Sequence, residues 1–220
     1  MSNSNPELKV GGIVLCGGAS ARMNYPKALL PLGDEVMLQR VVRIVSSCAH
    51  PVAVIASPEQ ELPPLASDVQ TAFDREPLSG PLAAIGQGLE LLQGNCDAVL
   101  VSGCDTPLIQ EAVLRRLLTI LDTHQLAMVR EGDRLHPLAA VYRISLIEPI
   151  QQMLSQGKRR LMDLVEQVDA IFLDTGELQT IDPGLRSLRN INTRAQYLEL
   201  LSELDLRDAT SLPFADELSD

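Results

Sequence analysis

The stretch GGIVLCGGASARMNYPKALL (residues 11–30) holds both the start of the fold and the first residues that suggest chemistry in this 220-residue chain. Residues 10–15 are continuously apolar, which is typical of a strand buried on both faces of a sheet. Gly17 and Gly18 follow this run, and Arg22 and Lys27 come shortly afterwards. Glycines let a backbone pass close to a ligand, and the two cations indicate that this ligand is anionic.

The rest of the chain alternates between strand-like and helix-like patterns. Apolar runs predict strands at 52–56, 69–73, 97–103, 126–130, 138–143, 170–174 and 187–191, and helical spacing predicts helices at 36–48, 81–92, 110–122, 145–155, 159–168 and 195–204. This alternation predicts right-handed crossovers and a doubly wound, mostly parallel sheet. We expect a disordered tail at 1–8, a single domain at 9–205 and an acidic, exposed or partly disordered tail at 206–220.

Composition excludes several classes of function. The net charge of −11 and the absence of a basic patch argue against a nucleic-acid partner, and an aromatic content of 3% leaves few rings to stack bases. No apolar run is long enough to cross a membrane. The chain start lacks the pattern of a secretory signal, and the four cysteines show no metal-site or CxxC spacing, so we expect buried thiols in a cytoplasmic protein.

Polar residues that follow the predicted strands are the first candidates for a site, because open parallel sheets bind ligands at the carboxyl ends of their strands. These residues are Asp74, Asp105, Asn190 and Asn192, and they should meet Gly17, Gly18, Arg22 and Lys27 at one edge. The glycine turn matches neither GxGxxG nor the P-loop pattern, so either a tight turn or a phosphate cradle fits it. Asp105 is either a helix cap or a ligand of Mg²⁺.

Longer motifs resemble a known family. VLCGGASARMNYPKALL resembles the LAGGxSxRMGxxKxL signature of the MobA-like nucleotidyltransferases, SGPLAAI is similar to their GPLAGI, and CDTP to their CDxP. HPLAAVYR, GKRRLMDLV and RNINT resemble later segments of the molybdenum cofactor guanylyltransferases, in the same order. This resemblance implies a Rossmann-like three-layer α/β/α sandwich of the nucleotide-diphospho-sugar transferase type. It also implies Mg²⁺-dependent transfer of GMP from GTP to molybdopterin, with release of pyrophosphate.

The resemblance also implies roles for individual residues. The implied nucleotide-binding residues are Leu15, Cys16, Gly17, Gly18, Lys27, Asp74, Gly80, Asp105, Asn190 and Asn192. The implied catalytic residues are Arg22, Lys27 and Asp105, with Asp105 also the metal ligand, and Arg159 and Arg160 would bind the acceptor. A phosphate monoester acceptor is already ionised at neutral pH, because its second pKa is about 6, so the reaction needs no general base.

Two alternatives to the guanylyltransferase stay open. Ile55 stands where guanylyltransferases often have an asparagine that contacts the nucleotide, whereas Gly17 leaves space for a purine. A CTP-dependent molybdopterin cytidylyltransferase, or an enzyme acting on another small phosphorylated molecule, is therefore the first alternative. An inactive nucleotide-binding module is the second. The expected macromolecular contacts are transient ones with other molybdenum cofactor biosynthesis or acceptor proteins.

Overall fold

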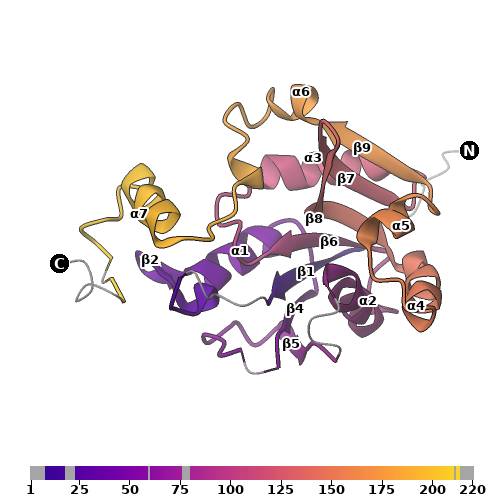
Figure 1. Ribbon diagram of the computed structural model, residues 1–220, viewed down its shortest axis with the longest axis horizontal. Helices are drawn as coiled ribbons and strands as arrows, with labels where there is room; N and C mark the ends of the chain where they lie inside the picture. Colours follow the sequence, from indigo (N-terminus) through magenta and orange to yellow (C-terminus); the bar gives the residue numbers. More distant parts are fainter. Residues whose placement is uncertain (1–7, 18–22, 59, 76–79, 211, 214–220) are drawn as a thin grey trace, which may run out of the picture.

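The computed structural model describes residues 8–17, 23–58, 60–75, 80–210 and 212–213. Its centre is a seven-stranded sheet with the strand order β5-β4-β1-β6-β8-β7-β9 (Figure 1). The strands of this sheet are β1 Val10–Cys16, β4 Val52–Ala56, β5 Val69–Phe73, β6 Ala98–Gly103, β7 Leu126–Glu131, β8 Arg134–Arg143 and β9 Ala170–Asp174. A separate small hairpin consists of β2 Pro31–Leu32 and β3 Glu35–Val36.

Helices lie on both faces of the large sheet. The α-helices are α1 Met37–Ser46, α2 Pro81–Leu92, α3 Glu111–Leu121, α4 Ile147–Ser155, α5 Leu161–Val165, α6 Thr175–Leu178 and α7 Arg194–Glu203. The described part of the chain also contains the short 3₁₀ helices η1 Lys27–Leu29, η2 Ile144–Leu146 and η3 Arg186–Leu188. Within the described ranges, none of these helices combines the length and apolarity needed to cross a membrane.

The central strand β1 explains why the sheet has a core on each face. β1 pairs in parallel with β4 and β6, and its residues from Gly11 to Cys16 are buried. Because successive side chains of a strand point to opposite faces, Val14 packs into a cluster that contains apolar residues of α1 and α3. Ile13 packs into the other cluster, which contains residues of α2 and α4. The predicted three-layer sandwich is thus confirmed.

The direction of the strands also agrees with the prediction of a mostly parallel sheet. The pairs β5–β4, β4–β1, β1–β6 and β7–β9 are parallel. β8 is inserted between β6 and β7 and runs antiparallel to both. The reason is the tight turn between β7 and β8, which forces the chain to reverse within a few residues.

One predicted strand is wrong, and some short elements were not predicted. Residues 187–191 do not form a strand: 186–188 are the 3₁₀ helix η3, which follows Leu185 in a left-handed backbone conformation, with φ of 49°. Ile191 donates its backbone N–H to the carbonyl oxygen of Asp105, at 2.8 Å, rather than joining a ladder. Its apolar side chain is buried, which imitates the pattern of a strand. The hairpin β2–β3 and the short helix α6 have too few residues to show a period.

The C-terminal helix α7 packs against the small hairpin and forms a third apolar cluster (Figure 1). The cluster includes Met23, Leu30, Ile191, Tyr197 and Leu200. The Tyr197 hydroxyl donates to the carbonyl oxygen of Pro31 at 2.6 Å. This packing fixes the segment that leads into α7 against the chain that follows the glycine turn.

The chain after α7 is packed in part. Leu206 packs against the third cluster, and Thr210 is buried, its hydroxyl accepting a hydrogen bond from the Gly33 N–H at 3.2 Å. The expectation of an exposed tail therefore fails for these two residues, because they cover the small hairpin. The domain boundaries themselves stay predictions.

A substitution at Gly12 tests how closely β1 packs against α1. A Cβ at Gly12 would lie 2.5 Å from Cγ1 of Val45, a stiff buried side chain, so Gly12→Ala should lower the free energy of unfolding by about 1–3 kcal/mol. Urea unfolding measures this loss. The matched control is Gly176→Ala, since a Cβ there meets nothing within 4 Å, and it should leave stability unchanged or raise it slightly. Equal stability of the two variants would contradict the packing described.

Candidate functional site at the carboxyl edge of the sheet

The strand order of the large sheet places a ligand site beside the end of β1. The chain adds β4 and β5 on one side of β1 and then crosses to add β6 on the other side (Figure 1). Such a change of direction leaves space outside the carboxyl ends of the two central strands, where open α/β sheets bind ligands. β1 ends at Cys16 and β6 at Gly103, and the Cys104 N–H donates to the carbonyl oxygen of Leu15 at 2.9 Å.

Three predicted residues from distant parts of the chain meet at this edge. The Lys27 ammonium donates to Oδ1 of Asn192 at 2.5 Å, and Lys27 Nζ lies 3.6 Å from Oδ2 of Asp105. The side chains of Lys27 and Asp105 are about one-fifth exposed (19% and 20%), so they are accessible and yet screened from bulk water. A partly buried cation beside a carboxylate and an amide oxygen is suited to binding an anion together with its counter-cation.

The turn after β6 holds the Asp105 carboxylate in place. The Thr106 N–H and the Thr106 hydroxyl both donate to the carbonyl oxygen of Gly103, at 3.2 and 2.8 Å, and the Thr106 hydroxyl also lies 3.2 Å from that of Ser102. A Cβ at Gly103 would come within 2.7 Å of Oδ1 of Asp105. Glycine at position 103 therefore lets the carboxylate fold back over the end of β6.

Lys27 is positioned by a short turn that follows the glycine-rich segment. Asn24 has a φ of 51°, a left-handed conformation that asparagine tolerates better than most residues. The Arg194 side chain donates from Nε to the carbonyl oxygen of Met23 at 3.1 Å, which links this turn to α7. Lys27 then begins η1, where the Leu30 N–H donates to its carbonyl oxygen at 3.1 Å.

The other predicted nucleotide residues lie along the same edge. Leu15 and Cys16 are buried at the end of β1, and Gly17 is exposed directly after them. Gly18 and Arg22 lie outside the described residues. Asp74 follows β5 and donates its N–H to the carbonyl oxygen of Ala56 at 2.7 Å, which places it two strands away from β1.

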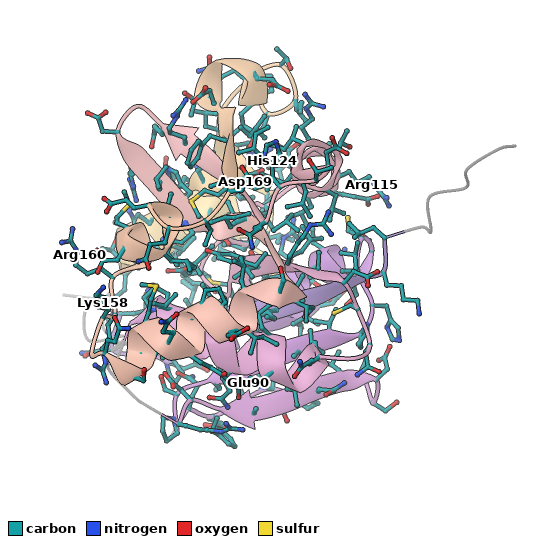
Figure 2. All side chains as sticks on the ribbon, turned by 90° about the vertical axis from the view of Figure 1, so that its right-hand side faces the viewer. Glu90, Arg115, His124, Lys158, Arg160 and Asp169 are labelled. Carbon is teal, nitrogen blue, oxygen red and sulfur yellow. The ribbon has the colours of Figure 1, made fainter. Side chains whose placement is uncertain are left out.

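The start of α2 also reaches the edge. Gly80 has a φ of 80° and precedes Pro81 at the first turn of α2, a conformation that favours glycine. A Cβ at Gly80 would lie 3.8 Å from the carbonyl oxygen of Arg159, so the chain between α4 and α5 passes beside the start of α2. Arg159 and Arg160 are exposed on this chain, and Figure 2 shows Lys158 and Arg160 projecting outward at the same margin of the molecule.

Asn190 and Asn192 were selected because they belong to a predicted strand, but the structure has no strand there, so the two side chains do not share a strand face. Of the two it is Asn192 that bonds to Lys27. A capping box begins α7: the Gln196 N–H donates to the Thr193 hydroxyl at 3.3 Å, and the Thr193 N–H donates to Oε1 of Gln196 at 3.0 Å. This cap holds Asn192 immediately before the helix.

The pKa values of two titratable groups, Cys104 directly after β6 and His136 on β8, are shifted by their surroundings. All four cysteines are free, and contact with the Cys16 thiol, together with burial, raises the pKa of the Cys104 thiol well above its usual range. Burial lowers the pKa of His136, whose Nε2 lies 3.2 Å from Oε2 of Glu131.

Sequence reasoning missed three polar residues at the edge, namely Ser57, Ser102 and Thr106. The rule that found Asp74 and Asp105 also selects Ser57, since it is the first polar residue after β4. Thr106 also follows β6, within the CDTP motif, whereas Ser102 lies inside β6 and is not selected; the structure brings their hydroxyls to 3.2 Å from each other beside Asp105.

Solved structures with this fold include nucleotidyltransferases. A structure of "Molybdopterin-guanine dinucleotide biosynthesis protein A" from Archaeoglobus fulgidus superposes with a TM-score of 0.71 at 20% identity, covering 89% of this chain and 98% of that one. "2-C-methyl-D-erythritol 4-phosphate cytidylyltransferase" from Thermus thermophilus gives a TM-score of 0.62 at 19% identity, covering 88% and 97%. At identities of 20% and 19%, these similarities show the fold of this chain and carry no conclusion about its activity.

Sequence comparison gives the family. The model of the MobA-like NTP transferase domain matches residues 12–171. A protein of Mycobacterium avium (strain 104) named "Probable molybdenum cofactor guanylyltransferase" is 32% identical over 199 residues, which cover 88% of this chain and 95% of that protein. The chain belongs to the MobA-like NTP transferase family, and its class of enzyme is the nucleotidyltransferases.

Proposed function

We propose that this protein transfers GMP from GTP to the terminal phosphate of molybdopterin in the molybdenum cofactor and releases pyrophosphate. The observation that carries the proposal is the meeting of Lys27, Asp105 and Asn192 at the carboxyl edge of β1 and β6. The names of the similar mycobacterial proteins support the choice of substrates.

The chemistry follows from the charges of the reactants. A phosphate oxygen of the acceptor attacks the α-phosphorus of GTP, the bond from that phosphorus to the oxygen that bridges to the β-phosphate breaks, and pyrophosphate leaves with the electron pair. The acceptor oxygen is already ionised, so no proton has to be removed. The main obstacle is repulsion between two anions, and positioned cations lower it.

Lys27 would bind the phosphates of GTP. Its ammonium is held by Oδ1 of Asn192 and lies near Asp105, so its position is set before the nucleotide arrives. Charge-assisted hydrogen bonds from an ammonium to phosphate oxygens are among the stronger ones in proteins. Arg22 and the backbone of Gly17 and Gly18 would add further donors to the phosphates.

Asp105 fits a magnesium ion that arrives with the triphosphate. Mg²⁺ prefers oxygen ligands and commonly takes one or two carboxylates, with phosphates and water as its other ligands. The described residues contain no group of three acidic, histidine or cysteine side chains that could hold a metal by themselves, and the Asp105 carboxylate beside Lys27 suits an ion that is shared with the phosphates. When bound, Mg²⁺ would neutralise charge on the phosphates.

The remaining residues complete the two substrate sites. Leu15, Cys16, Asp74, Gly80 and Asn190 would line the nucleotide. The exposed guanidinium groups of Arg159 and Arg160 would bind the acceptor phosphate, because a guanidinium matches phosphate geometry with paired donors. A cytoplasmic location and transient contacts with cofactor-handling proteins are part of the same proposal.

Release of pyrophosphate from different nucleotides tests the proposed function. The purified protein is mixed with Mg²⁺, the molybdenum cofactor and one of GTP, CTP or ATP. We expect pyrophosphate with GTP, and none when the cofactor or Mg²⁺ is left out. Turnover with CTP and not with GTP would show a cytidylyltransferase, and GTP binding without pyrophosphate release would show an inactive module. Either result would overturn the proposal.

A further inference from the structure

Ser57 lies at the carboxyl edge beside the glycine turn. It follows β4 directly, and its N–H donates to the carbonyl oxygen of Cys16 at 3.0 Å, which continues the pairing of β4 with β1. Its own carbonyl oxygen accepts from the Gln60 N–H at 2.9 Å. The backbone of Ser57 is therefore fixed on both sides.

The hydroxyl of Ser57 leans over Gly17. A Cβ at Gly17 would lie 2.8 Å from Oγ of Ser57, which is closer than such atoms approach in proteins. The side chain is half-buried, and within the described ranges its Oγ makes no hydrogen bond. A half-buried hydroxyl without a protein partner is available to a ligand, and hydrogen bonding to that ligand offsets the cost of removing it from water.

Ser57 is also the residue of this segment that can offer a hydrogen bond to a ligand. β4 consists of apolar residues only, and Ile55 is 2% exposed and packed in the core beneath α2. Ile55 thus contributes packing and no polar contact. Ser57, two residues further on, points to the same face of the sheet as Ile55 and Gly17.

We propose that Ser57 is a base-binding residue whose hydroxyl hydrogen-bonds to the edge of the base that lies over Gly17. This inference rests on the proposed function, in which the end of β1 lines the nucleotide. A serine hydroxyl both donates and accepts, so it can pair with the O6 and N1–H edge of guanine. Its loss removes a contact to the base and leaves the phosphate contacts of Lys27 unchanged.

The test compares GTP with inorganic triphosphate, which has no base. Calorimetric titration in Mg²⁺ should show that Ser57→Ala weakens GTP binding about tenfold, the value of one neutral hydrogen bond, and changes triphosphate binding less than twofold. In the transfer reaction, KM for GTP should rise while kcat stays the same. Ser47→Ala is the control, because that hydroxyl bonds to Ile44 and Glu111 at the far end of α1.

The other outcomes separate the two proposals. Unchanged GTP binding in Ser57→Ala would overturn the role of Ser57 and leave the proposed function intact. An equal loss for GTP and triphosphate would also overturn it, since the hydroxyl would then serve the phosphates or the fold. If the unaltered protein binds no GTP, the proposed function fails, and the contact to its base fails with it.

Discussion

Replacing Asp105 by asparagine is expected to lower kcat/KM for nucleotidyl transfer by about 10³-fold, which corresponds to about 4 kcal/mol of transition-state stabilisation. The change removes the charge that would hold Mg²⁺ and keeps the shape of the side chain. Stability should change little, because Lys27 Nζ lies 3.6 Å from the Asp105 carboxylate, a long distance for an ion pair, and keeps its hydrogen bond to Asn192. Steady-state pyrophosphate release, together with thermal unfolding, measures both effects.

Asp97→Asn is the matched control for this variant. Asp97 precedes the same strand, β6, at the opposite edge of the sheet, where its exposed carboxylate accepts the Lys9 N–H at 2.9 Å. Activity of Asp97→Asn should equal that of the unaltered protein. If both variants kept full turnover, Asp105 would have no part in catalysis.

Lys27→Met should lower kcat/KM by about 10²- to 10³-fold, the usual loss when one preorganised donor to a developing charge is removed. Methionine preserves most of the stem and removes the ammonium that bonds to Asn192. Arginine should not restore activity, because its longer side chain and planar guanidinium do not place a donor at the position of Lys27 Nζ, which lies 2.5 Å from Oδ1 of Asn192 and 3.6 Å from Oδ2 of Asp105. The same steady-state assay checks both variants.

Lys9→Met controls for the loss of a lysine charge. Lys9 is exposed just before β1, at the amino edge of the sheet, and its backbone contact to Asp97 does not depend on the side chain. We expect full activity and unchanged affinity for inorganic triphosphate. Lys27→Met should in contrast lose triphosphate affinity, and an affinity equal to that of the control would remove Lys27 from the phosphate site.

The sequence predicts the three-layer sandwich well because the hydrophobic patterns of its strands and helices are clear and depend on neighbouring residues only. The strands at 52–56 and 69–73 and the helix at 81–92 match the structure end to end, since turn residues bound each of them. The segment 187–191 failed for a tertiary reason. Ile191 is buried among the residues of α7, and its N–H bonds to Asp105 instead of a neighbouring strand. Local pattern carries no information about such a partner.

In the candidate site, likewise, some residues could be predicted from the sequence and some contacts could not. Lys27 and Asp105 were predicted from their places after β1 and β6, because the topology of a parallel sheet decides which ends meet. The contact of Asn192 with Lys27 depends on the docking of α7 against the small hairpin, which no period reveals. Ser57 could have been predicted as a polar residue that follows a strand, but only the structure shows that its hydroxyl lies over Gly17.

A crystal structure with GTP and Mn²⁺ in place of Mg²⁺ tests most directly whether one edge of the sheet gathers the triphosphate and its metal. Anomalous scattering should place the Mn²⁺ ion within coordination distance of an Asp105 carboxylate oxygen, with phosphate oxygens bonded to the Lys27 ammonium. A nucleotide bound elsewhere, or an ion held without Asp105, would contradict the account.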